Sequence, residues 1–127
     1  MPRETANALL SRDETRIERL RFGEITIGGE RYTDDVLLLQ DRVRSRWWRK
    51  EGHLLQLEDL TEVLADRPDV LLVGTGLQEC MKVSPEVVAY TKKAGIELLV
   101  FDTRTACQSY NYLRGKRRVA AALHLTC

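Results

Sequence analysis

The chain has 127 residues, of which 43% are hydrophobic and 31% charged, and this length and composition indicate one globular domain and exclude a disordered chain. Its 20 basic and 19 acidic residues leave a net charge of +1, so the composition gives no overall reason to expect nucleic acid as a partner. No apolar run approaches the ~18 residues that a membrane span requires, and we expect no such span.

The first 20 residues mix four arginines with four acidic residues and contain no apolar stretch. A secretory signal needs such a stretch, and a mitochondrial presequence is poor in acidic residues, so we expect no targeting signal. The three cysteines form no CxxC pair, which favours a reducing compartment over a disulfide framework. The prediction is a cytoplasmic protein with a polar N-terminal segment at residues 1–16 and a single α/β domain at residues 17–127.

Short strands are expected in the first third of the chain. Apolar residues alternate with polar ones over residues 20–27, which is typical of half-buried strands. Gly28-Gly29 separates residues 24–27 from residues 30–33, and two glycines suit the positive φ angles of a type I′ hairpin turn. A more buried strand is expected at residues 36–39, so this part of the chain is predicted to be antiparallel β.

The remainder alternates helices with strands. Helices are predicted over residues 57–64, before Pro68; from Ser84-Pro85 to Gly95; and from about Thr103 to the residues before Gly115. Strands are predicted between and after them, at residues 70–73, 96–101 and 119–125. This alternation predicts an α/β fold with a partly parallel sheet, helices packed on it and an antiparallel β extension at the N-terminus.

The tripeptide Gly74-Thr75-Gly76 follows a predicted buried strand, where α/β proteins tend to bind ligands. Glu79 occupies the third glycine position of a dinucleotide fingerprint, and no Gly-Lys-Ser/Thr of a phosphate loop follows. We favour a tight turn with a close backbone approach, with ligand binding as the alternative.

Any zinc site would draw on Cys80, Cys107, His124 and Cys127, but these residues lack the short paired spacing of structural zinc sites. On the predicted last strand, His124 and Cys127 point to opposite faces, so we predict no metal site. His124 has two interpretations: a hydrogen-bonded structural residue, or an imidazole that acts as a general base or contacts a ligand. No serine or cysteine nucleophile motif offers it a catalytic partner.

Residues 42–50 contain five basic residues and two tryptophans. Trp47 and Trp48 are adjacent, so on an extended segment one can pack inside while the other stays at the surface. We predict an interaction surface formed by Arg46, Trp47, Trp48 and Arg49, because tryptophan and arginine are enriched at protein–protein hot spots. The alternative is that arginine stems and a local loop cover both rings, which leaves the segment a structural role.

Several short motifs occur together, in the order Phe22-Gly23-Glu24-Ile25, Tyr32, Asp35-Val36, Trp48, Gly52-His53, Val73-Gly74-Thr75-Gly76, Pro85-Glu86, Tyr110-Asn111 and Ala122-Leu123-His124-Leu125-Thr126-Cys127. Their combination resembles the domain of unknown function 498 family, which includes the mitochondrial complex I assembly factor 3 proteins and the adipogenesis-associated proteins. The resemblance covers about residues 17–127. It implies a three-layer α/β domain with a mixed central sheet and implies no established reaction or cofactor. The family motifs fall on six candidate ligand-binding residues: Gly74, Thr75, Gly76, Tyr110, Asn111 and His124.

The assembly-factor branch of that family acts by binding other proteins while respiratory complex I is built. By analogy, we expect a non-catalytic protein-binding or assembly-factor-like domain with a protein partner, no cofactor and no nucleic acid; a second copy of the chain is a further candidate partner. The alternative is a small-ligand-binding protein or an enzyme that uses the loop Gly74-Thr75-Gly76 with His124 or Asn111.

Overall fold

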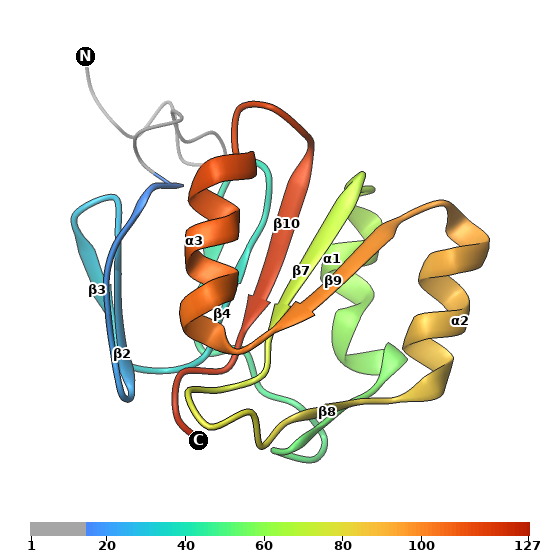
Figure 1. Ribbon diagram of the computed structural model, residues 1–127, viewed down its shortest axis with the longest axis horizontal. Coiled ribbons are helices and arrows are strands. Elements are labelled where there is room, and N and C mark those ends of the chain that lie inside the picture. Colours follow the sequence, from blue (N-terminus) through green and yellow to red (C-terminus); the bar gives the residue numbers. More distant parts are fainter. Residues whose placement is uncertain (1–14) are drawn as a thin grey trace.

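The computed structural model describes residues 15–127 (Figure 1), so most of the predicted polar segment lies outside the described residues. The described chain starts with a three-stranded antiparallel sheet in the order β1-β2-β3. Its strands are β1 Ile17–Arg21, β2 Glu24–Ile27 and β3 Glu30–Tyr32. Gly28 and Gly29 form the turn between β2 and β3 with φ angles of 56° and 86°, which confirms the predicted hairpin.

The central sheet has five strands in the order β5-β4-β10-β7-β9. They are β4 Val36–Leu38, β5 Val43–Arg44, β7 Val70–Gly74, β9 Glu97–Phe101 and β10 Val119–Leu123. Strand β7 runs parallel to both β10 and β9, whereas β4 runs antiparallel to β10, so the sheet is mixed as expected. Two short parallel strands, β6 Leu54–Leu55 and β8 Lys82–Val83, form a separate pair.

Helices cover both faces of the central sheet and complete the expected three layers (Figure 1). They are α1 Thr61–Ala65, α2 Pro85–Ala94 and α3 Thr103–Leu113. One hydrophobic core joins α3 and the N-terminal sheet to one face, and a second core joins α1, α2 and Trp47 to the other. Strand β10 serves both cores: Val119, Ala121 and Leu123 face the first, and Ala120 and Ala122 face the second. Among the helices of residues 15–127, none has the length and apolar character needed to cross a membrane.

The sequence patterns predict none of the short strands β5, β6 and β8, and two predicted elements also differ from the structure. The helix expected over residues 57–64 divides into a short 3-10 helix, Leu57–Leu60, and α1, because Leu60 has non-helical backbone angles. The last strand ends at Leu123 and not at Leu125. Beyond it, the His124 N–H donates to the Gly74 carbonyl at 3.0 Å and the Leu125 N–H donates to the Asp35 carboxylate at 2.7 Å, so the ladder with β4 stops.

Candidate functional site

The candidate site lies at the edge of the sheet where the parallel strands β7, β9 and β10 end, which we call the carboxyl edge. Because β4 is antiparallel to β10, the residue that precedes β4, Asp35, lies at this edge too. The loop after β7 wraps around the last residues of the chain: the Leu77 N–H donates to the Thr126 carbonyl at 2.7 Å, and the Cys80 N–H donates to the Cys127 carbonyl at 2.9 Å. The edge therefore gathers segments that are far apart in the sequence.

The loop Gly74-Thr75-Gly76, which we call the glycine loop, packs directly against the backbone of Cys127 and the side chain of Thr103. Gly76 has a φ of 111°, and a Cβ on it would overlap the Cys127 backbone and approach His124 Cδ2 to 2.9 Å. A Cβ on Gly74 would lie 2.8 Å from Thr103 Oγ1. The Thr103 hydroxyl accepts from the Gly76 N–H at 2.8 Å and donates to the His124 carbonyl at 2.6 Å. The tight turn with close backbone approach is confirmed, and the Thr75 hydroxyl is also used internally, as a donor to the Phe101 carbonyl at 3.1 Å.

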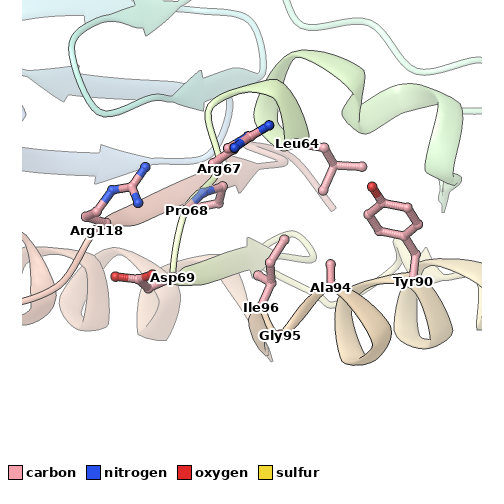
Figure 2. Close-up of a pocket in the computed structure, with 9 residues that line it drawn as sticks. All are labelled: Leu64, Arg67, Pro68, Asp69, Tyr90, Ala94, Gly95, Ile96 and Arg118. Atoms are coloured by element: carbon pink, nitrogen blue, oxygen red, sulfur yellow. The ribbon is translucent and has the colours of Figure 1, made fainter.

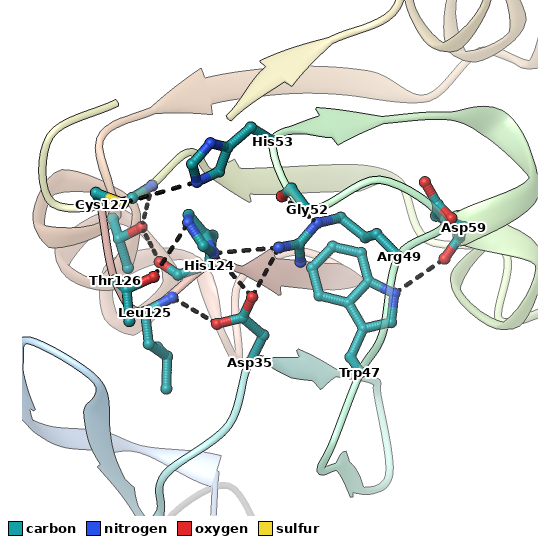
Figure 3. A network of polar contacts seen from close by, with 12 residues as sticks. Asp35, Trp47, Arg49, Gly52, His53, Asp59, His124, Leu125, Thr126 and Cys127 are labelled. Carbon is teal, nitrogen blue, oxygen red and sulfur yellow. Dashed lines mark hydrogen bonds and ion pairs between the residues drawn. The ribbon is translucent and has the colours of Figure 1, made fainter. Parts of the chain in front are cut away.

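Asp35, His124 and Arg49 form a buried charged cluster (Figure 3). Asp35 Oδ2 lies 2.8 Å from His124 Nδ1 and 2.9 Å from Arg49 Nη2, while Asp35 Oδ1 accepts from the Leu125 N–H. The exposed fractions of the Arg49 and His124 side chains are 4% and 6%. The Arg49 guanidinium stacks 4.7 Å from the centre of the Trp47 ring and donates to the Gly52 carbonyl. An Arg49 charge this deeply buried depends on its carboxylate partner.

The protonation of the cluster follows from its contacts. Burial alone would raise the pKa of Asp35, but hydrogen bonds from His124 and from the Leu125 N–H, together with the Arg49 charge, outweigh burial and lower it. Asp35 is therefore an anion, and its Oδ2 accepts from His124 Nδ1 when that nitrogen carries the ring proton; Arg49 Nη2 lies 3.2 Å from the same nitrogen. In a neutral imidazole, a proton on Nδ1 leaves Nε2 with a free lone pair.

A second group of side chains lies beside the first: His53, His124 and Cys127, which we call the histidine–cysteine cluster (Figure 3). One ligand atom from each lies within 4.8 Å of the others. Cys127 Sγ is 3.6 Å from His53 Nε2, and the two imidazole rings meet edge to face with centroids 5.4 Å apart. The prediction of no metal site assumed that a strand places His124 and Cys127 on opposite faces. That premise is wrong, because β10 ends at Leu123.

Two of the six predicted ligand-binding residues lie elsewhere. Tyr110 is buried in the core under α3. The Asn111 amide accepts from the Ile17 N–H at 2.9 Å and donates to the Ile17 carbonyl at 2.7 Å, which attaches β1 to α3. The structure thus brings together Gly74, Thr75, Gly76 and His124, and separates them from Tyr110 and Asn111. Cys107 lies in the same core, where burial raises its pKa to about 12.

The tryptophan pair divides as predicted. Trp47 is 4% exposed and its indole N–H donates to the Asp59 carbonyl at 3.0 Å, whereas Trp48 is 70% exposed. Arg46 is also exposed, lies 3.8 Å from Asp34 and holds a φ of 54°, which is uncommon for a residue with a side chain. Arg49, expected beside the exposed tryptophan, instead points inward. Only Arg46 and Trp48 of the four predicted interaction residues are therefore accessible to a partner.

A hollow of about 410 Å³ lies at the opposite edge of the sheet, before the starts of β7, β9 and β10 (Figure 2). Leu64, Tyr90 and Ile96 contribute its apolar wall, and Arg67, Asp69 and Arg118 its polar rim. None of the six predicted ligand-binding residues lines it. The hollow gives no support to the ligand-binding alternative as we predicted it.

The sequence interpretation missed Asp35 and His53 as site residues, although both stand in the motifs that carried the family resemblance. Asp35 is 89 residues from His124, and His53 is 74 residues from Cys127. No spacing rule connects residues so far apart in the sequence. Their presence in the family motifs was the one signal that could have identified them.

Comparisons with known proteins agree with the fold and the family resemblance. A family model described as "Protein of unknown function (DUF498/DUF598)" matches residues 17–124. The chain is 33% identical over 70 residues to NADH dehydrogenase [ubiquinone] 1 alpha subcomplex assembly factor 3 of Xenopus tropicalis, covering 54% of this chain and 38% of that protein. The Mus musculus protein of the same name is 31% identical over 104 residues, covering 76% of this chain and 52% of that protein. The chain thus spans about half or less of the length of these relatives.

Among solved structures, a conserved hypothetical protein from Pyrococcus horikoshii has a similar fold, with a TM-score of 0.77 and 30% sequence identity. The match covers 87% of this chain and 98% of that one.

Proposed function

The chain belongs to the DUF498/DUF598 family, and from this premise we propose that it is a non-catalytic protein-binding domain of the assembly-factor type. Its relatives named assembly factor 3 support this function class. The proposed contact surface is the aromatic edge, which we define as Phe22, Arg46 and Trp48. The proposed partner is a protein that offers an apolar pocket for an aromatic ring and an acidic group for Arg46.

The observation that carries the proposal is the contrast between Trp48 and Trp47. Trp47 packs in the core and satisfies its indole N–H, so it supplies the stabilising contribution of this segment. Trp48, at 70% exposed, leaves a large apolar ring in water. Tryptophan and arginine are among the residues most enriched at protein–protein hot spots.

A second exposed aromatic residue lies at the same edge. Phe22 is 62% exposed, and the adjacent Gly23 N–H donates to the Leu125 carbonyl at 2.8 Å. The Trp47 N–H donates to the Asp35 carbonyl at 2.9 Å, and the Asp35 carboxylate holds the Leu125 N–H. The backbone next to Phe22 and the backbone next to Trp48 are therefore both fixed to the end of β10. Rigid aromatic anchors lose little conformational entropy on binding.

The alternative, a small-ligand-binding protein or an enzyme that uses the loop Gly74-Thr75-Gly76 with His124 or Asn111, has less support. Asn111 uses both ends of its amide on Ile17, and the Gly74–Gly76 loop uses its polar groups within the protein.

The three cysteines are free thiols, which supports the cytoplasm as the proposed compartment.

Site-specific photo-crosslinking in the native cells tests the proposal. A photoreactive amino acid at position 48 should form a discrete crosslinked product, whereas the same group at the exposed Tyr112 on α3 should not. Binding of the identified protein to the purified chain is then measured by calorimetry. Trp48→Ala should weaken binding by at least ~2 kcal/mol, about 30-fold, and Tyr112→Ala should leave it unchanged. Equal affinities of wild type and Trp48→Ala would reject the aromatic edge. A crosslinked product that contains only two copies of this chain would replace a foreign partner with self-association.

A further inference from the structure

Beyond protein binding, we propose that the histidine–cysteine cluster is a binding site for a divalent metal ion of the zinc type, with His53 Nε2, His124 Nε2 and Cys127 Sγ as ligands. The site replaces the expectation of no metal, whose geometric premise the end of β10 removes. It differs from the zinc set considered from the sequence: Cys80 and Cys107 are absent from it, and His53 takes part.

The distances suit a zinc ion. Zinc bonds to nitrogen and sulfur are about 2.0–2.3 Å, so neighbouring ligand atoms in a tetrahedral site lie roughly 3.3–3.8 Å apart. Cys127 Sγ and His53 Nε2 already have such a separation, at 3.6 Å. One ligand atom from each of the three side chains lies within 4.8 Å of the others, so the longest of these distances needs to shorten by roughly 1 Å on zinc binding. Such a movement is open to His53, which sits on an exposed loop.

His124 has the surroundings of a metal ligand rather than of a surface histidine. Metal-binding histidines commonly donate their second ring N–H to a carboxylate, which fixes the tautomer and aims the other nitrogen at the metal. Asp35 supplies that carboxylate at 2.8 Å from Nδ1 and is itself held by Arg49 and the Leu125 N–H. Within residues 15–127, the one hydrogen-bond contact of His124 Nε2 is a long one of 3.4 Å with the Thr126 hydroxyl.

The ligand types select the metal. Two imidazoles and one thiol suit zinc and its borderline neighbours, whereas magnesium and calcium prefer oxygen ligands. The Arg49 charge is matched by Asp35, so the ion would meet one thiolate and two neutral rings once Cys127 loses its proton.

The test measures zinc affinity of the reduced full chain by competition with a chromophoric chelator. The wild type should bind one zinc ion per chain with micromolar or tighter affinity. His53→Ala and Cys127→Ser should each weaken binding by more than ~10-fold, and Cys107→Ala, which removes a thiol outside the cluster, should bind as the wild type does. Because His53 is exposed, its replacement should leave the fold intact, which circular dichroism checks.

Cobalt provides an independent readout of the ligands. The cobalt adduct of the wild type should show a thiolate-to-cobalt charge-transfer band that persists in Cys107→Ala and is lost in Cys127→Ser. Asp35→Asn should weaken zinc binding by about 10–100-fold, because an amide N–H would donate to His124 Nδ1 and move the ring proton to Nε2. Absence of stoichiometric zinc in the wild type, or equal zinc affinity in His53→Ala and the wild type, would overturn the proposal.

Discussion

Asp35 and His124 lie 89 residues apart in the sequence, yet their side chains meet at 2.8 Å and join the start of β4 to the end of β10. The same carboxylate pairs with Arg49 and takes the Leu125 N–H in place of a strand neighbour. One side chain therefore ends the last strand, orients a histidine and neutralises a buried guanidinium.

The first prediction concerns the removal of that carboxylate. Asp35→Ala leaves the buried Arg49 charge without a partner, so we expect a loss of about 3–5 kcal/mol in the free energy of unfolding. Asp34→Ala is the matched control, since Asp34 pairs with the exposed Arg46 at 3.8 Å and should change stability by less than about 1 kcal/mol. Urea unfolding of both variants measures the difference. Similar midpoints and slopes for the two would show that the buried pair contributes no more than the surface pair.

Gly76→Val tests the closeness of the glycine loop to the chain end. A positive φ costs a β-branched residue about 1–2 kcal/mol, and overlap with the Cys127 backbone should add roughly 1–3 kcal/mol. Gly29→Val separates these effects, because Gly29 has a φ of 86° but open space within 4 Å of the position that a Cβ would take. Thermal unfolding should show a larger loss for Gly76→Val than for Gly29→Val. Equal losses would mean that the loop relaxes away from Cys127.

Local patterns predicted the elements well because the interactions that form them are local. The Gly28-Gly29 turn follows from the φ angles of two residues, and the two faces of β10 follow from the alternation of Val119–Leu123. The same alternation misplaced the end of the strand. It continues through Leu125, but the backbone there bonds to Gly74 and Asp35, which no local pattern shows.

The candidate site was harder to predict because each of its pairs is non-local. The predicted last strand singled out His124. Asp35, Arg49 and His53 lie beside it because β4 pairs antiparallel with β10 and the loop after β5 returns to the same edge of the sheet. Asn111 gives the opposite error. Its family motif suggested a site residue, whereas its amide serves as an anchor for β1, and the sequence does not distinguish an amide that bonds backbone from one that faces a ligand.

The two tryptophans should separate stability from surface chemistry. Trp47→Ala removes a buried ring and leaves the Asp59 carbonyl without its donor, so we expect a loss of about 3–5 kcal/mol. Trp48→Ala should change the free energy of unfolding by less than about 0.5 kcal/mol. Chemical denaturation monitored by far-ultraviolet circular dichroism avoids the loss of tryptophan fluorescence. A large loss for Trp48→Ala would assign that ring a structural role and remove it from the aromatic edge.

Burial raises the pKa of Cys107 from the ordinary value of 9.0 to about 12, and this shift predicts a pH-dependent stability. Above pH 9 the thiol ionises in the unfolded chain but stays protonated in the folded one, so its contribution to stability is complete below pH 9 and is lost as the pH rises towards 12. The loss approaches at most ~1.4 kcal/mol per pH unit. The difference in the free energy of unfolding between the wild type and Cys107→Ala isolates this group, because other titrations cancel. That difference should shift against the wild type as the pH rises from about 9 to about 10.5, and iodoacetamide should leave Cys107 unmodified in the folded protein at about pH 8. A pH-independent difference, or rapid alkylation of Cys107 before unfolding, would show that the thiol is not held in the core under α3.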